Sequence, residues 1–109
     1  MFRTAKQRKE FCAECPIARV VNLIGDPFTL LIIRDLLKGP KRFSDLEISL
    51  SGVSTRTLSR KLKDLRDCGL VTHYRPQNKS SRFLYALTKK GMRLRLVAES
   101  MRRFGEQNL

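Results

Sequence analysis

The segment from Ser54 to Lys63 carries hydroxyl and basic side chains at a spacing that suits contact with nucleic acid. Arg56 and Arg60 lie four residues apart, so on a helix both guanidinium groups project from one face. A guanidinium can pair with both acceptors of a guanine edge. Hydroxyl groups near a helix N-terminus can hold a phosphate, and the candidates here are Ser54, Thr55 and Thr57. The candidates on the polar face of the helix are Thr55, Arg56, Ser59, Arg60 and Lys63. The alternative is a basic helix face that contacts only water.

Further cations lie outside this segment, at positions suited to the phosphate backbone or the minor groove. Arg75, Lys79 and Arg82 flank or occupy the polar tip of a predicted hairpin, and Arg42 precedes a short predicted helix. An ordinary polar turn is the alternative for the hairpin tip.

Cys12 and Cys15 form a C-x-x-C pair. A zinc site needs two further ligands, and only Cys68 and His73 remain, in other predicted elements, so we expect no metal site. A redox role is more plausible, because Cys15 begins a predicted helix near Lys9 and Arg19, which would favour the thiolate. The alternative for Cys15 is a small buried apolar residue, and we expect Cys68 in the core.

The bulk composition narrows the class of protein. Lys and Arg total 23 against 10 Asp and Glu, a net charge of +13 that suits a polyanionic partner such as nucleic acid, with an anionic membrane as the competitor. The sequence contains neither an apolar run long enough for a membrane span nor a signal peptide, and three cysteines fit a reducing compartment. We therefore expect a cytoplasmic protein with no membrane partner. Because the sequence has no phosphate-binding glycine loop and no catalytic constellation around His73, we expect neither an enzyme nor a bound cofactor.

Hydrophobic periodicity predicts the elements that would position these side chains. Helices are expected from Pro16 to Ile24, from Pro27 to Leu37, from Ser44 to Leu50 and over 54–68, followed by strands over 70–75 and 82–87 and a helix over 88–107. Lys41 and Arg42 could form a very short strand. Ser44 and Glu47 match a capping box at the start of the short helix. Asp26, Ser54 and Thr88 are the expected N-caps of the other three helices after residue 25, and Gly69 should end the helix over 54–68 in the left-handed conformation.

This order of elements predicts a mostly α fold with a small β-hairpin (α+β), the winged helix-turn-helix. We expect a single domain, 1–109, with a basic N-terminal arm (1–11) and a C-terminal dimerisation helix (88–107). Its recognition helix would span about 54–68 and enter the major groove, and its wing, about 75–82, would lie on the minor groove or on phosphates.

The residues over about 15–92 resemble the HxlR-type transcriptional regulators. The resemblance rests on Cys15-Pro16-Ile17, on Ile24-Gly25 followed by Thr29 to Leu37, on Gly39 to Leu46, on Gly52 to Val71, and on Tyr85, Leu87, Thr88 and Gly91. One departure is clear: Pro27-Phe28 stands where that family usually has Lys-Trp.

The resemblance implies a winged-helix homodimer that binds double-stranded DNA as a repressor or an activator. In that family the first and last helices commonly form the dimer, and here the apolar residues available are Val20, Val21, Ile24, Leu94, Val97, Met101 and Phe104. Some members sense oxidants or electrophiles through the cysteine that matches Cys15, with Cys12 here as a resolving candidate. Two alternatives remain: a thiol-based redox-sensing regulator, and a winged-helix module that binds protein or RNA.

Overall fold

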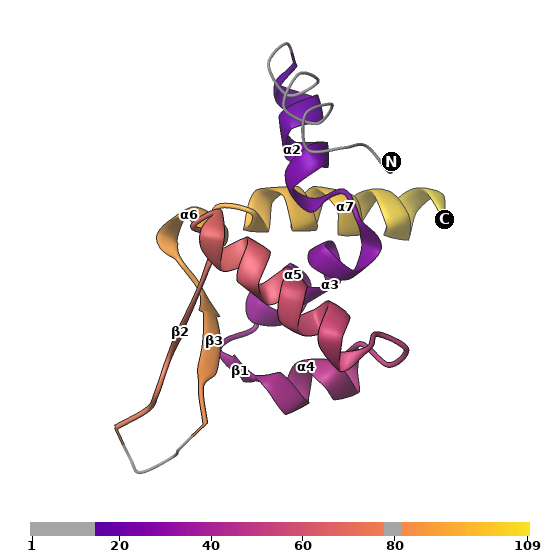
Figure 1. Cartoon of the computed structure of the whole chain (residues 1–109). Helices are drawn as coiled ribbons and strands as arrows, with labels where there is room; N and C mark the ends of the chain where they lie inside the picture. The colour runs from indigo at the N-terminus through magenta and orange to yellow at the C-terminus, as the bar shows by residue number, and fades with distance from the viewer. Residues whose placement is uncertain (1–14, 78–81) are drawn as a thin grey trace. The chain divides into compact units, whose positions relative to one another are not determined.

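A computed structural model describes residues 15–77 and 82–109, which belong to two compact units, one ending at Leu31 and the other spanning Ile32–Leu109 (Figure 1). The predicted basic arm, residues 1–11, lies outside the described residues, as do Cys12 and Lys79.

The first unit contains helix α2 (Pro16–Ile24) and the start of helix α3 (Pro27–Leu36). Pro16 is the first residue of α2, where the missing N–H of proline costs no helical hydrogen bond. Asp26 Oδ1 accepts a hydrogen bond from the Thr29 backbone N–H at 3.0 Å, which confirms the predicted N-cap of α3. The turn between the helices requires glycine, because a Cβ on Gly25 would lie 2.2 Å from the carbonyl oxygen of Val21.

The second unit contains the end of α3 and the remaining elements, in the order β1 (Lys41–Arg42), α4 (Phe43–Ser49), α5 (Thr55–Asp67), β2 (Val71–Tyr74), β3 (Leu84–Leu87), α6 (Lys89–Met92) and α7 (Arg95–Asn108). The three strands form an antiparallel sheet in the order β1-β3-β2, with Val71 opposite Leu87 and Tyr74 opposite Leu84. A mostly helical chain with one small sheet confirms the predicted fold class, and the two-residue strand β1 is also confirmed.

Leucine and isoleucine side chains form the core of the second unit. Its fully buried members are Ile32, Ile33, Leu46, Leu58, Leu62 and Leu70. Three of the four helices predicted in this part of the chain, now α3, α4 and α5, bury apolar residues spaced three or four apart. The core therefore explains the hydrophobic periodicity from which these helices were predicted.

The start of α4 differs from the predicted capping box. The helix begins one residue earlier, at Phe43, and the Asp45 carboxylate accepts a hydrogen bond from the backbone N–H of Arg42 at 3.0 Å. Glu47 instead accepts from the Thr55 hydroxyl. Pairing of Lys41–Arg42 with β3 holds Arg42 extended, and this fixes the first residue of the helix.

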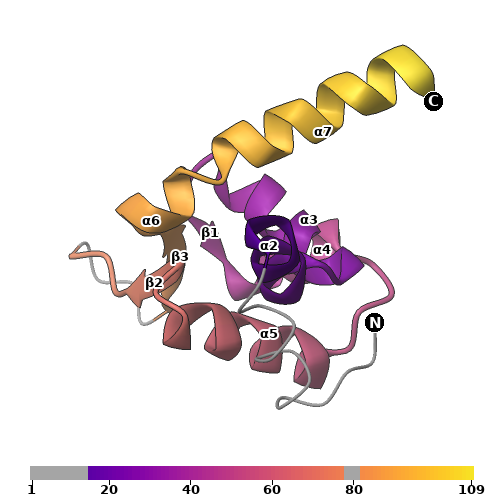
Figure 2. The same ribbon diagram turned by 90° about the horizontal axis from the view of Figure 1, so that it is seen from above.

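The prediction of one continuous C-terminal helix over 88–107 was wrong, because this part of the chain forms two helices, α6 and α7. Thr88 caps α6 as expected, accepting from the Gly91 N–H at 3.1 Å. The Arg93 and Leu94 N–H groups then bond to carbonyls three residues back, which ends α6 before α7 begins. Figure 2 shows α7 continuing away from α5 and the hairpin within this unit.

Among the described residues, no single helix is long and apolar enough to cross a membrane, and α2 and α3 meet that criterion only as a bent pair.

Candidate nucleic-acid interface

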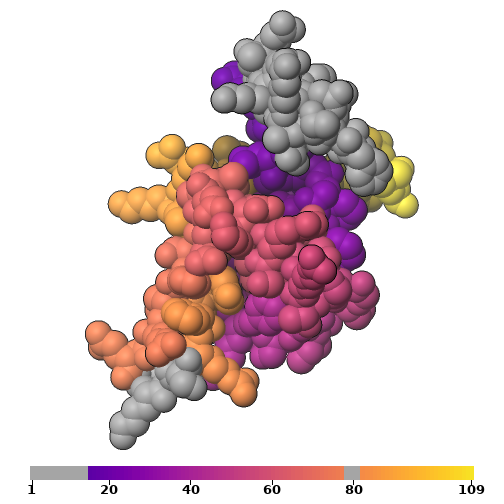
Figure 3. Space-filling view, viewed as in Figure 1, coloured from indigo at the N-terminus to yellow at the C-terminus, as the bar shows by residue number. Residues whose placement is uncertain are grey.

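Helix α5 separates its two faces completely. Leu58, Leu62 and Leu65 are buried, whereas Arg56, Ser59 and Arg60 are exposed. In the part of the chain that the structure describes, no hydrogen bond or ion pair joins these three exposed side chains to another residue. In Figure 3 the exposed face of α5 crosses the front of its unit beside the strands of the hairpin. The apolar face is therefore used for packing, and the polar face is left accessible to a ligand.

The start of α5 is fixed by its own hydroxyl groups. Ser54 Oγ accepts from the Thr57 N–H at 3.0 Å and lies 2.9 Å from Thr57 Oγ1, which confirms Ser54 as the N-cap. Thr55 Oγ1 donates to Glu47 Oε2 at 2.7 Å, and this bond joins α4 to α5. Gly52 lies in the turn between the helices with φ of +98°, a conformation that favours glycine. These contacts hold α4 and α5 together as a helix-turn-helix. The Thr55 hydroxyl donates its proton to Glu47, so it has no second proton to donate to a ligand.

The predicted site residues lie on three elements of the second unit. Lys63, on α5, forms an exposed ion pair with Asp67 at 3.0 Å. Arg42 follows Lys41 in β1 and is exposed, and Arg82 is exposed just before β3. Arg75 lies just after β2 with its guanidinium carbon 4.8 Å from the centre of the Phe83 ring. The structure thus brings cations from β1, α5 and the hairpin into one unit.

A stack of side chains between α5 and the hairpin was not identified from the sequence. Arg66 Nη1 lies 3.1 Å from His73 Nε2, and the His73 ring stacks on Phe83 with centroids 4.4 Å apart. Because Arg75 lies over the same Phe83 ring, the series runs from α5 through β2 to the residues next to the two strands. The available signal was that His73 follows the buried Val71 by two residues, which places both on one face of β2.

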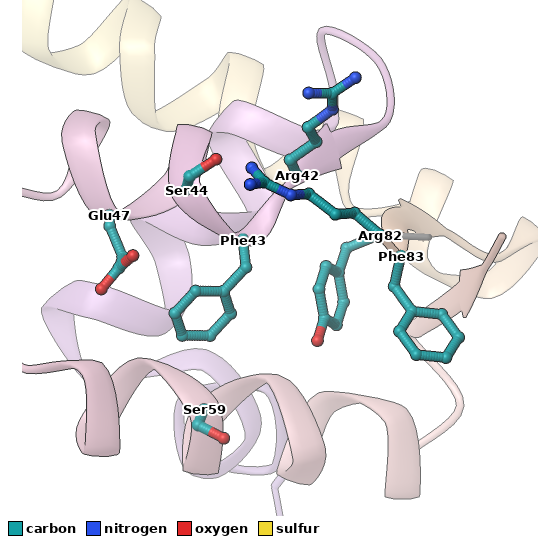
Figure 4. A pocket seen from close by; sticks show the side chains of 8 residues that line it. Arg42, Phe43, Ser44, Glu47, Ser59, Arg82 and Phe83 are labelled. Atoms are coloured by element: carbon teal, nitrogen blue, oxygen red, sulfur yellow. The ribbon is translucent and has the colours of Figure 1, made fainter. Parts of the chain in front are cut away.

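A cleft of ≈ 430 Å³ opens between α4, α5 and the hairpin (Figure 4). Two of its side chains are guanidinium groups, three are aromatic rings, and the others carry hydroxyl or carboxylate groups. They are Arg42, Phe43, Ser44, Glu47, Ser59, Arg82, Phe83 and Tyr85. Figure 4 shows Phe43 pointing towards Ser59 and Arg82 reaching from the hairpin towards Ser44.

Both cysteines in the described part of the chain are exposed. Cys15 is the N-cap residue of α2, and Cys68 is the C-cap residue of α5. The expectation that Cys68 belongs to the core is therefore wrong: it lies three residues after the buried Leu65, where the helix ends and the chain turns at Gly69 with φ of +77°. Burial, the alternative weighed for Cys15, is also wrong. Within residues 15–77 and 82–109, no group of three or more His, Cys, Asp or Glu side chains could hold a metal ion.

The sequence matches the family described as HxlR-like helix-turn-helix over residues 23–109. The chain is 33% identical over 91 residues to the transcriptional regulator sll1512 of Synechocystis, covering 84% of this chain and 67% of that protein. It is 30% identical over 94 residues to the transcriptional regulator YodB of Bacillus subtilis, covering 85% and 84%.

The fold also matches solved structures of YodB. The reduced form superposes with a TM-score of 0.75 at 29% identity, covering 86% of this chain and 93% of that one. The quinone-bound form gives a TM-score of 0.73 at 30% identity, covering 85% and 99%. With the family match over most of its length, the chain belongs to the HxlR-like helix-turn-helix family of transcriptional regulators.

Proposed function

We propose that this regulator binds double-stranded DNA sequence-specifically as a homodimer, with α5 in the major groove and the hairpin on the minor groove or on phosphates. The observation that carries the proposal is the exposed polar face of α5, where Arg56 and Arg60 project without a partner among the described residues. The buried leucines behind them anchor the helix, so these two guanidinium groups are presented on a rigid element.

Phosphate contacts would supply most of the affinity, and base contacts would supply the specificity. The net charge of +13 favours binding to a polyanion through the release of counterions. Ser54, Thr57, Ser59 and Lys63 surround the base-reading arginines on α5, and Arg42, Arg75 and Arg82 extend the positive surface. From the sequence alone, Lys79 is a further candidate for a phosphate contact. Thr55 contributes by positioning, since its hydroxyl proton holds α4 against α5.

Exposed apolar residues on α2 and α7 support the homodimer. Val21 on α2 is 54% exposed, and Met101 and Phe104 on α7 are 50% and 61% exposed. Ile24, another residue expected in the interface, is already buried within the chain. A chain that leaves such side chains in water gains free energy by covering them with a second copy, and two recognition helices would then reach half-sites about one helical turn apart.

The test compares variants in a fluorescence-anisotropy assay, using DNA from upstream of the protein's own gene and a scrambled duplex of equal length. Arg56→Ala and Arg60→Ala should each reduce the preference for the upstream DNA by roughly tenfold, the loss of one bidentate base contact. Arg103→Ala on α7 removes the same charge at an exposed position and should leave the preference unchanged. If Arg56→Ala and Arg60→Ala also leave it unchanged, α5 does not read the sequence.

Lys79→Ala distinguishes a phosphate contact from a base contact. It should weaken binding to both duplexes equally and reduce the slope of affinity against salt by about one unit. Preferential binding to duplex RNA, or a protein partner in the absence of DNA binding, would instead favour an interaction module.

An exposed thiol supports a second candidate function, in which Cys15 senses electrophiles. Cys15 begins α2, and the quinone-bound relative YodB shows that a protein of this family can carry such a ligand. The Cys15 thiolate would add to a ring carbon of a quinone, forming one C–S bond while the ring takes up a proton and becomes a hydroquinone. Cys12 would be the resolving partner when the signal is an oxidant.

Cys15→Ser and Cys68→Ser provide a matched pair, because both thiols are exposed. Benzoquinone should release DNA from the wild type and from Cys68→Ser but not from Cys15→Ser. A Cys15→Ser protein that still responds would exclude this cysteine as the sensor.

A further inference from the structure

The cleft between α4, α5 and the hairpin has a chemical character that contact with the DNA backbone does not require. Phe43, Phe83 and Tyr85 supply aromatic surface, and the Phe43 and Tyr85 rings lie 6.5 Å apart at 54°. Phosphates need hydrogen-bond donors and cations, whereas aromatic rings provide apolar surface for another ring. A volume of ≈ 430 Å³ lies within the range of about 300–1,000 Å³ that small-molecule sites occupy.

The charges at the cleft favour an anion. Two guanidinium groups, Arg42 and Arg82, line it together with one carboxylate, Glu47. That carboxylate accepts the Thr55 hydroxyl proton at 2.7 Å, so part of its capacity is already used. A guanidinium group is a suitable partner for a carboxylate, because its paired N–H groups match the two oxygens.

Hydroxyl groups complete the lining. Ser59 Oγ and Tyr85 Oη make no hydrogen bond to another residue within the described ranges. They are therefore available as donors to a ligand next to the aromatic surface, and Figure 4 shows Ser59 on the opposite side of the cleft from the two arginines.

We propose that this cleft is a binding site for a small aromatic carboxylate, which packs its ring against Phe43 and Tyr85 and pairs its carboxylate with Arg42 and Arg82. The same Arg42, Ser59 and Arg82 are proposed to contact DNA, so the ligand and the DNA compete for them. The ligand acts as an effector that releases DNA, and by linkage DNA weakens the ligand by the same factor. Only this regulatory consequence rests on the proposed function, because the binding itself is independent of DNA.

Benzoate is the first probe, titrated into the ¹⁵N-labelled full chain without DNA and followed by amide chemical shifts. Saturable shifts at Phe43, Ser44, Ser59 and Tyr85 are expected. Arg42→Gln and Arg82→Gln should each weaken benzoate by about tenfold, the effect of losing one charged hydrogen bond. Arg103→Gln removes an equivalent charge from an exposed residue of α7 that does not line the cleft and should leave the affinity unchanged.

Two other probes test the chemistry. Benzylamine has the same aromatic ring but a positive charge, and inorganic phosphate has a negative charge but no ring. Both should bind more weakly than benzoate. Phosphate binding as tightly as benzoate would overturn the proposal and assign the cleft to the DNA backbone. No saturable shift with benzoate would also overturn it, whatever the outcome of the DNA assay. In a separate measurement, benzoate should displace bound DNA from the wild type and less effectively from Arg82→Gln.

Discussion

Helices α5 and α7 are almost equal in length but bury their apolar residues to opposite extents. Leu58, Leu62 and Leu65 of α5 are buried within the chain, whereas α7 contains no buried residue. Leu96 on α7 is 76% exposed. The comparison shows that the apolar face of α5 packs within the chain, which leaves the polar face of that helix accessible to a ligand. The other leaves its apolar residues at least partly exposed within the part of the chain that the structure describes.

The largest expected effect comes from the buried side of this comparison. Leu62→Ala should lower the free energy of unfolding by about 2–5 kcal/mol, because it leaves a cavity in the core. Leu96→Ala is the matched change on α7 and, at protein concentrations where the chain is monomeric, should cost less than about 0.5 kcal/mol, as exposed substitutions do. Urea unfolding measures both, and equal losses would mean that α7 is packed as tightly as α5.

A charge on the apolar side of α7 should break the proposed dimer. Phe104→Glu places an unpaired carboxylate in the interface and should weaken dimerisation by roughly 100-fold. Gln107→Glu adds the same charge at an exposed position on α7 and should have little effect. Sedimentation velocity over a range of protein concentrations reports the change, and a Phe104→Glu protein that remains dimeric would place the interface elsewhere.

The junction that leads into α7 should be sensitive to one added carbon. A Cβ on Gly91 would lie 2.1 Å from the carbonyl oxygen of Leu70, so Gly91→Ala should destabilise the protein by about 1–3 kcal/mol. In a solvent-exposed helix the same change would stabilise it. Gly105→Ala on α7, where a Cβ would meet nothing within 4 Å, is the control. Thermal unfolding should separate the two variants in opposite directions.

The smallest effect distinguishes the two helix starts. Ser54 caps α5 through its side chain, whereas Leu94, at the start of α7, makes no side-chain cap bond. Ser54→Ala should cost about 1 kcal/mol in urea unfolding. Ser100→Ala, at an exposed position inside α7, should cost nothing measurable. Equal values for the two variants would show that the cap bond contributes no stability.

Most of the fold could be predicted from local rules. Asp26, Ser54 and Thr88 each cap the predicted helix, and Gly69 ends α5 in the predicted left-handed conformation. These features depend on neighbouring residues in the sequence. The start of α4 could not be predicted in the same way, because Ser44-Glu47 and Arg42-Asp45 both have the required spacing. Pairing of β1 with β3 decides between them, and that pairing joins residues more than 40 positions apart.

The candidate site was predictable only along one helix. The periodicity of α5 separates Leu58 and Leu62 from Arg56 and Arg60, and the structure shows this separation. The contact between Arg66 and His73 and the cleft next to Tyr85 arise where α5 packs on the hairpin. The spacing of Val71 and His73 places the His73 ring on a face of β2, but it does not report the partners of that ring. The exposure of Cys68 was missed because a C-cap position can face either the core or the solvent.

The hairpin begins and ends at one place in the molecule. Thr88 Oγ1 donates to the Gly69 carbonyl oxygen at 2.6 Å, and the Thr88 N–H donates to the Leu70 carbonyl oxygen at 3.0 Å. Lys90 Nζ lies 3.2 Å from the carbonyl oxygen of Cys68, at the end of α5. The chain therefore leaves and returns to the same anchor, so the length of the hairpin does not set the spacing between α5 and α7. During evolution the wing can lengthen or shorten in register while that spacing is inherited unchanged, and an engineered insertion between β2 and β3 would have the same freedom.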